Sequence, residues 1–205
     1  ENIIDITINA VSDAPIITDL APLDGAIVLD GSDDYIEVAH NASLDLNIFS
    51  MEFWAYHDNL GEDSGLVTKG LADFESLKMT TLADGSVNTA FLASDGERVA
   101  ATSATGLVKA NTWQHYAVTN DGKFLSLYLD GELVSRTDHI DKLVAANTDS
   151  LFFGTEKLSN GLGRHLSGKL DEIRIFDYSL TDDEVLSSMN AELGGNEEGL
   201  VSYWK

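Results

Sequence analysis

Apolar and polar residues alternate with a period of two in several short segments of the chain, which is the pattern of β-strands with one buried face. In residues 49–57 the alternation puts Phe49, Met51 and Phe53 on one side of a strand. Residues 123–129 repeat the pattern with three alternating leucines. The chain therefore reads as a series of strands that each bury one face.

Turn residues separate the predicted strands. The sequence Asn-Asp-Gly at 120–122 precedes the leucine-rich strand, and Asp130 with Gly131 joins that strand to the next one. An Asp-Gly connection is typical of a β-hairpin, because glycine tolerates a positive φ. Many short strands joined in this way predict an all-β fold, an antiparallel β-sandwich.

One segment has the signature of a helix. Within residues 181–193, Thr181 is placed to cap the first turn and Glu184 to complete a capping box. Gly194 and Gly195 then end the segment. We predict one short helix near the C-terminal end of the sandwich.

The first 22 residues differ from the rest. Ile4, Ile6 and Ile8 alternate with polar residues, as in a strand. The two prolines of the chain, Pro15 and Pro22, follow in a stretch that reads as an extended linker.

A length of 205 residues fits one sizeable domain with extensions. We predict three parts: the last strand of a preceding repeat with its linker at 1–22, a β-sandwich at 23–193, and a linker with a terminal strand at 194–205. Because the first residues already read as a strand, we expect the sequence to be part of a longer polypeptide.

The net charge of the chain limits the kinds of molecule that it can bind. Twelve Lys and Arg residues against 35 Asp and Glu residues give 12 − 35 = −23. Such acidity disfavours nucleic acid and anionic membrane surfaces, because their phosphates would be repelled. It favours divalent cations, and solvation alone explains many of the single exposed carboxylates.

The chain has no cysteine, which excludes disulfides and thiol chemistry. An acidic, β-rich sequence without cysteine is typical of a bacterial extracellular module that is stiffened by metal. The sequence contains no signal peptide and no apolar run that predicts membrane insertion.

Two acidic motifs lie far apart in the sequence, and each carries a carboxylate where strand alternation predicts burial. In residues 30–36, Asp34 shares strand parity with Ile36. In the second motif, Asp171 shares parity with Ile173 and Ile175. A buried carboxylate needs a cation or several hydrogen-bond donors, because burying it alone is costly.

Calcium suits such motifs, since it takes six to eight oxygen ligands. We therefore predict a metal site that joins the two motifs through Asp34 and Asp171. The alternative is that Asp30 caps backbone amides in a turn while Asp171 pairs with a basic side chain.

The order of segments from Ala26 to Leu186 resembles the laminin G-like, concanavalin A-like jelly-roll family. The segments that carry the resemblance are AIVLDGSDDYIEV, SLDLNIFSMEFWAY, LVTKG, TWQHYAVTNDGKFLSLYLDGELV, LFFG and SGKLDEIRIFDYSLTDDEV. The resemblance implies a concanavalin A-like sandwich. It also implies a structural calcium, held by Asp30 and Asp34, the carbonyl at Ser32, and Asp171.

Two end segments add to this resemblance. The family often begins with a strand that is missing before Ala26, and a similar segment stands at residues 199–205. That segment is either an edge strand of this sandwich or the start of a following module. At the other end, the first strand and the exit Val11–Pro15 resemble the end of cadherin-like or immunoglobulin-like repeats in large, RTX-type bacterial adhesins.

The sequence lacks the residues of the catalytic families that share this fold. Their glucanases carry alternating carboxylates on one strand, whereas here Asp171 and Glu172 are adjacent and Glu52 stands alone. Adjacent residues of a strand point to opposite faces. We expect that the chain is not an enzyme.

Two loop regions are candidates for ligand contacts. His57 adjoins Asp58 and the acidic loop that contains Asp63, while Arg164 and His165 lie in a glycine-rich loop. Loops on a rigid sandwich commonly carry binding. Alternatively, the charged residues around Asp58 and Asp63 are simply solvated, and the glycine-rich loop with Arg164 and His165 is only a flexible connection.

Together these features predict a calcium-dependent, non-catalytic binding module of a bacterial surface adhesin. We expect it to be extracellular, monomeric within a multidomain chain, and to bind glycans in cell adhesion or biofilm formation. The alternatives are a protein ligand, or a structural spacer without its own ligand. The argument from fold to carbohydrate is one of analogy.

Overall fold

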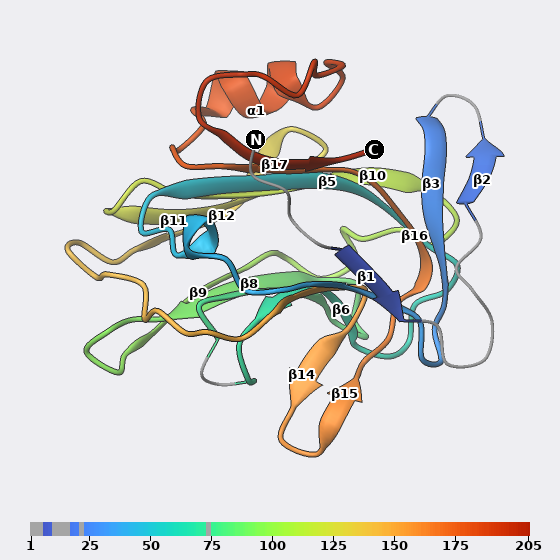
Figure 1. Cartoon of the computed structure of the whole chain (residues 1–205), viewed down its shortest axis with the longest axis horizontal. Coiled ribbons are helices and arrows are strands. Elements are labelled where there is room, and N and C mark those ends of the chain that lie inside the picture. Colours follow the sequence, from blue (N-terminus) through green and yellow to red (C-terminus); the bar gives the residue numbers. More distant parts are fainter. Residues whose placement is uncertain (1–5, 10–16, 21–22, 73–74) are drawn as a thin grey trace.

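The computed structural model describes residues 6–9, 17–20, 23–72 and 75–205, with side chains from residue 25 onwards. Two antiparallel sheets pack face to face around one apolar core (Figure 1). The predicted antiparallel β-sandwich is confirmed.

The seven-stranded sheet has the order β1-β4-β13-β6-β7-β8-β9. Its strands are, in that order, Ile6–Asn9, Tyr35–Val38, Leu151–Phe153, Ser64–Lys69, Leu77–Thr81, Val87–Leu92 and Arg98–Thr102. A short 3-10 helix, η1 (Ala42–Leu44), lies between β4 and β5. Outside the two sheets stands a small hairpin of β14 (Glu156–Leu158) and β15 (Gly161–Gly163).

The eight-stranded sheet has the order β12-β11-β10-β5-β16-β3-β2, and β17 also pairs with β16. Its strands are, in that order, Glu132–Asp138, Phe124–Leu129, Trp113–Asn120, Phe49–His57, Ser167–Phe176, Leu23–Asp30 and Ile17–Leu20, with β17 at Leu200–Trp204. β3 pairs with the first half of β16 and β17 with the second half, while β5 runs along the other side. The terminal segment therefore forms an edge strand of this sandwich.

Two short strands of the N-terminal segment pair with the sandwich. β1 is antiparallel to β4, and β2 is antiparallel to β3. The rest of residues 1–22, with both prolines, lies outside the described residues. The preceding adhesin repeat at 1–22 stays a prediction.

The alternation predicted for β5 and β11 is confirmed. Phe49, Met51 and Phe53 belong to the core, as do Leu125 and Leu127. Their burial from water is the main favourable contribution to folding, at roughly 1.5–3 kcal/mol for each large side chain.

The predicted Asp-Gly hairpin joins β11 to β12. Asp130 has a φ of 52° and Gly131 a φ of 79°, so both central residues are left-handed as this two-residue turn requires. The Asp130 carboxylate accepts hydrogen bonds from the His115 amide at 2.9 Å and from Gln114 Nε2 at 2.9 Å. These bonds fix the turn against the neighbouring strand β10.

A β-bulge in β16 overturns the predicted direction of Asp171. Asp171 lies opposite Trp54 and Arg174 opposite Glu52, so two residues of β16 face a single residue of β5. The extra residue shifts the parity of the strand, and Glu172 there has a φ of 52°. Asp171 therefore lies with Trp54 on the outer face of the sheet, away from the isoleucines that follow it.

The bulge also brings Glu172 to that outer face, where a buried cation gathers several partners. Arg174 donates to Glu52 Oε1 at 3.0 Å and to Glu172 Oε2 at 2.5 Å. It also donates to the carbonyls of Ser188 at 2.7 Å and Ala191 at 2.5 Å. The expectation that Asp171 and Glu172 point to opposite faces is wrong, while Glu52 is the only carboxylate on β5, as predicted.

The predicted helix is present as α1 (Asp182–Ser188), which lies over the outer face of the eight-stranded sheet (Figure 1). Both hydrogen bonds of the capping box between Thr181 and Glu184 are present. The helix ends at Ser188, earlier than predicted, and the carbonyls of Ser188 and Ala191 accept hydrogen bonds from Arg174. Among the described residues, no helix is long and apolar enough to cross a membrane.

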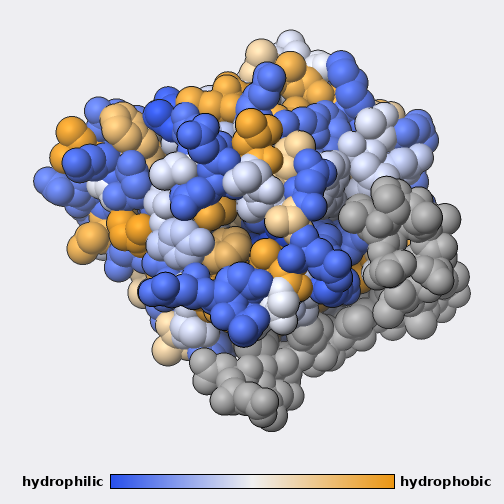
Figure 2. Space-filling view, turned by 90° about the horizontal axis from the view of Figure 1, so that it is seen from above, coloured by the Kyte–Doolittle hydropathy of each residue, from blue (hydrophilic) through white to orange (hydrophobic). Residues whose placement is uncertain are grey.

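Hydrophilic side chains cover most of the molecular face seen from the α1 side, with hydrophobic ones in small groups between them (Figure 2). Tyr178 and Leu186, two of the exposed hydrophobic residues, are 37% and 53% exposed. Scattered apolar residues of this kind are normal on a protein surface.

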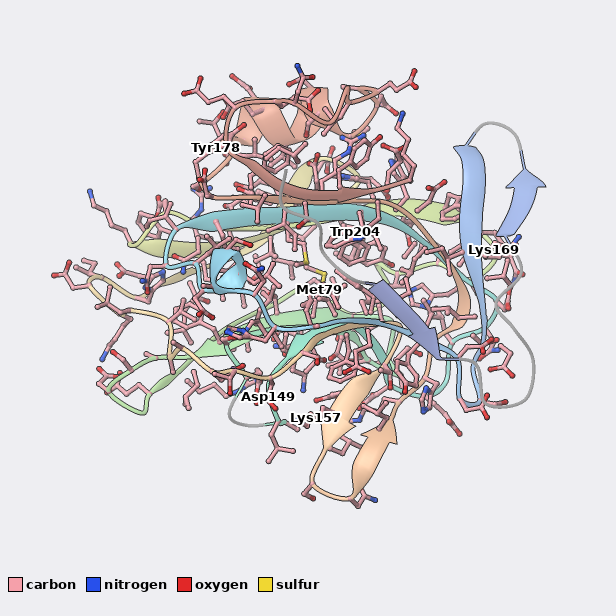
Figure 3. All side chains as sticks on the ribbon, in the orientation of Figure 1. Met79, Asp149, Lys157, Lys169, Tyr178 and Trp204 are labelled. Atoms are coloured by element: carbon pink, nitrogen blue, oxygen red, sulfur yellow. The ribbon has the colours of Figure 1, made fainter. Side chains whose placement is uncertain are left out.

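Trp204 of β17 points into the space between the sheets, toward the region of Met79 (Figure 3). Its ring meets that of Phe153 edge to face at a centroid distance of 5.5 Å. The terminal strand thus contributes an aromatic side chain to the core as well as backbone pairing.

Two histidines are buried with neutral rings. His57 is 1% exposed and packs against Tyr116, and burial lowers its pKa to about 4. His115 is also 1% exposed, and burial together with the charge of Arg174 lowers its pKa to about 3.

We predict that Arg174→Met destabilises the fold by about 3–5 kcal/mol, because it leaves the Glu52 carboxylate buried without its cation. Urea unfolding measures this loss. Lys205→Met is the control, since its pair with Glu192 is exposed, and should cost less than about 1 kcal/mol. A loss below 1 kcal/mol for Arg174→Met would contradict a stabilising role.

We predict that stability falls as the pH drops from 6.5 toward 4. In this window the unfolded chain binds protons at His57 and His115 that the folded protein does not, so each contributes a loss of about 2 kcal/mol by pH 5. His57→Gln should reduce the slope of unfolding free energy against pH. An unchanged slope in His57→Gln would refute this origin.

Candidate metal-binding rim

The loop between β3 and β4 gathers three carboxylates at one end of the sandwich. Asp30, Asp33 and Asp34 each offer an oxygen within 4.8 Å of the other two. Asp30 is exposed, Asp33 half-buried and Asp34 buried. As predicted, Asp34 is buried in step with Ile36.

Local hydrogen bonds shape this loop. Asp30 Oδ1 accepts from the amides of Ser32 at 2.7 Å and Asp33 at 3.3 Å, and Asp34 Oδ2 accepts from the Asp30 amide at 3.2 Å. The Ser32 amide in particular lowers the pKa of the Asp30 carboxyl, which therefore stays ionised. The turn that was the alternative to a metal site is thus present, with Asp30 capping its amides.

A glycine is required in this turn. Gly31 has a φ of 78°, and a Cβ there would lie 2.7 Å from Ser167 Cβ. The loop can therefore pass close to β16 only with glycine at this position.

The structure does not bring Asp171 to this loop. Asp30 lies opposite Ser167, and Asp171 is four residues farther along β16. At about 3.3 Å per residue, this separates the two aspartates by about 13 Å along the strand. Asp171 Oδ1 instead accepts from the Glu172 amide at 2.8 Å.

The donor set of the loop fits a hard cation. Three carboxylates supply oxygen ligands of the kind that Ca²⁺ and Mg²⁺ take, and carbonyls or water complete such a shell. The acidic cluster is therefore able to hold a divalent ion without Asp171.

Strand pairing brings a fourth predicted residue to the same rim. Asp58 directly follows β5, and its amide donates to the Ser167 carbonyl at 2.9 Å. The Ser167 hydroxyl donates to Asp58 Oδ2 at 3.2 Å. Because Ser167 also lies opposite Asp30, these groups line adjacent strand ends.

The glycine-rich loop contributes Arg164 and His165 to the rim. His165 Nδ1 lies 3.4 Å from the Asp34 carbonyl. Arg164 Nη2 lies 3.6 Å from Asp63 Oδ2, while Nη1 donates to Glu156 Oε2 at 2.7 Å. Asp58, Asp63, Arg164 and His165 therefore meet at one rim with the acidic loop.

His57 does not share this surface. Its side chain faces the core against Tyr116, so a ligand at the rim does not reach it. Its neighbour Asp58, rather than His57, lies at the rim.

Glu156 was not predicted as a site residue, yet its buried carboxylate binds Arg164 of the rim. Its carboxylate is fully buried between Arg164 and Lys78, whose Nζ lies 2.6 Å from Oε1. Its sequence neighbourhood gives no signal of this role, because the two cations come from other elements.

Known proteins share this architecture. A sequence profile of the concanavalin A-like lectin/glucanases superfamily matches residues 30–186, whereas no curated protein sequence matches the chain. The binding domain of Paraclostridial Mosquitocidal Protein 1 has a TM-score of 0.70 at 18% identity, over 91% of this chain and 47% of that one.

Two further solved structures are similar. A Bacteroides ovatus protein whose name ascribes carbohydrate binding to it has a TM-score of 0.69 at 19% identity, over 91% of this chain and 56% of that one. The binding domain of botulinum neurotoxin DC, solved in complex with SialylT, has a TM-score of 0.69 at 13% identity, over 94% and 48%. This chain thus spans about half the length of these proteins, and at such identities the likeness shows the fold.

The profile match covers most of the sandwich, from the acidic loop after β3 to helix α1. With the two-sheet architecture, it shows that the chain belongs to the concanavalin A-like lectin/glucanase superfamily.

Proposed function

We propose that the chain is a non-catalytic glycan-binding module in which a calcium ion at Asp30, Asp33 and Asp34 organises the binding rim. The observation that carries this proposal is that four polar side chains from two loops, Asp58 with Asp63 and Arg164 with His165, meet the acidic cluster.

Calcium supports this role by its ligand preference. The Ser32 carbonyl and water are proposed to complete the shell around the three carboxylates. An ion there would hold the β3–β4 connection rigid and offset the charge that three close carboxylates bring together.

The rim offers the groups that recognise sugar hydroxyls. Carboxylates such as Asp58 accept hydrogen bonds, while Arg164 and His165 donate them. The carbohydrate-binding name of the Bacteroides ovatus relative and the SialylT complex of the neurotoxin domain support a glycan as the partner.

A binding role without catalysis agrees with the carboxylates of the outer sheet face. Glu52 and Glu172 both contact Arg174, and Glu52 is fully buried beneath the α1 segment. A glycosidase needs two carboxylates that flank a bound glycosidic bond. A substrate has no access to Glu52 in this arrangement.

The sequence resemblance supports a wider setting for the module. We propose that it belongs to a surface-attached or secreted bacterial adhesin and acts in cell adhesion or biofilm formation. A spacer that holds another domain away from the surface is the second candidate, favoured by the paired N-terminal strands β1 and β2.

We predict that 1 mM Ca²⁺ stabilises the protein relative to chelator by about 1.4 kcal/mol, for a dissociation constant of about 0.1 mM. Thermal unfolding with and without EDTA measures this. Asp34→Asn should abolish the calcium response. Asp171→Asn and the exposed Asp95→Asn should keep it, and a normal response in Asp34→Asn would refute the site.

We predict selective signal on a glycan array in the presence of about 1 mM Ca²⁺, lost on adding chelator. His165→Ala should weaken binding to the best glycan at least tenfold, about 1.4 kcal/mol, by removing a donor. His40→Ala is the control, because His40 lies at the far end of β4. A blank array from folded protein would favour the spacer.

A further inference from the structure

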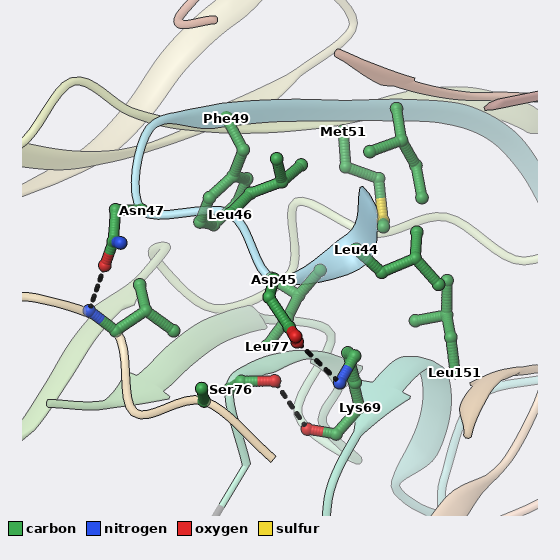
Figure 4. A pocket seen from close by; sticks show the side chains of 13 residues that line it. Leu44, Asp45, Leu46, Asn47, Phe49, Met51, Lys69, Ser76, Leu77 and Leu151 are labelled. Atoms are coloured by element: carbon green, nitrogen blue, oxygen red, sulfur yellow. Dashed lines mark hydrogen bonds and ion pairs between the residues drawn. The ribbon is translucent and has the colours of Figure 1, made fainter. Parts of the chain in front are cut away.

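A pocket opens at the end of the sandwich opposite to the acidic rim (Figure 4). β4 begins beside Asp34 at the rim and leads toward this end, as does β6, which starts next to Asp63 and ends at Lys69. The pocket has a volume of about 550 Å³ including the space at its mouth.

The wall of the pocket is largely aliphatic. Leu44 and Leu46 contribute from η1 and the segment after it, Phe49 and Met51 from β5, and Leu151 from the opposite sheet. A sugar would find few partners for its hydroxyls here, and unpaired polar groups cost free energy on burial. The lining selects an apolar group.

One charged side chain reaches this apolar wall. Lys69 is 3% exposed, and its Nζ donates to the Asn147 carbonyl at 2.8 Å and to Asn147 Oδ1 at 3.1 Å. The nearest carboxylate is Asp45, whose Oδ1 lies 3.5 Å from Nζ (Figure 4). The buried ammonium of Lys69 is thus held by two hydrogen bonds to Asn147 and by a longer contact with the Asp45 carboxylate.

The distance to Asp45 is long for an ion pair of this kind. Close pairs between ammonium and carboxylate have separations of about 2.7–2.9 Å, and the buried pair of Lys78 with Glu156 is at 2.6 Å. Asp45 is also 32% exposed at the pocket mouth, where its carboxylate is solvated. Burial lowers the pKa of the Lys69 ammonium, which a closer anion would counteract.

We propose that this pocket binds a small apolar carboxylate, with its alkyl or aryl part between the sheets and its carboxylate on Lys69 Nζ in place of Asp45. The apolar lining provides the burial, and the buried ammonium of Lys69, whose contact with Asp45 is longer than a close ion pair, provides the polar anchor. The site is separate from the rim and does not depend on glycan binding there.

The test is a calorimetric titration with sodium octanoate, compared with octanol and octylamine. We expect saturable 1:1 binding of octanoate, at least about tenfold tighter than octanol and tighter still than octylamine, because hydrogen bonds to charged groups contribute about 1.5–3 kcal/mol. No saturable octanoate binding, or octanol binding as tightly as octanoate, overturns the proposal.

Two substitutions with opposite expected effects locate the site. Lys69→Met should lose at least about tenfold in octanoate affinity while keeping that for octanol. Asp45→Asn, on the partly exposed residue, should bind octanoate several-fold more tightly because the competing carboxylate is gone. Unfolding curves establish that each variant is folded, and if Lys69→Met does not fold, Asp45→Asn alone decides. Unchanged octanoate affinity in Asp45→Asn and in folded Lys69→Met overturns the site.

Discussion

The arrangement of the outer sheet face depends on one buried cation. Arg174 joins Glu52 of β5, Glu172 of the bulge in β16, the carbonyl of Ser188 at the end of helix α1, and the carbonyl of Ala191 after it. Ser188 adds a hydroxyl bond to Glu52 at 2.7 Å. Each of these groups would lie buried with unmet polar atoms if the others were absent, so the interaction is cooperative. Burial raises the pKa of Glu52, and the nearby guanidinium and hydroxyl oppose that rise. The bulge in β16 puts Glu172 on the face where Glu52 and this cation lie.

Features that depend on neighbouring residues could be read from the sequence. The alternation of β5, the Asp-Gly turn and the capping box at Thr181 each express a local preference, and each is present. The bulge in β16 could not be predicted from the sequence, because one extra residue in a strand has no distinct pattern of apolar and polar residues. It reversed the direction of Asp171, while the position of that residue, four residues along β16 from the one opposite Asp30, keeps it away from the predicted metal site.

The same division holds for the candidate sites. The acidic loop lies within five consecutive residues, so its carboxylates are necessarily close. The rim around it forms through strand pairing, which the sequence indicated only as two separate polar loops. Glu156 and Lys69 were missed because their burial is produced by distant segments, such as Asn147 over Lys69. For a charged residue in a short strand, the neighbouring sequence does not show that distant apolar segments will bury it.

The place of β16 has a consequence for how the protein is made. This strand lies between β5 on one side and both β3 and β17 on the other, so partners from early and late in the chain meet on it. A chain that emerges progressively from the ribosome or through a secretion channel cannot complete the eight-stranded sheet until residue 204 is free. Until then β3 and β5 remain without the strand that joins them. Such non-local pairing slows folding and prolongs the exposure of strand edges, so early β-strands would need protection from aggregation during synthesis.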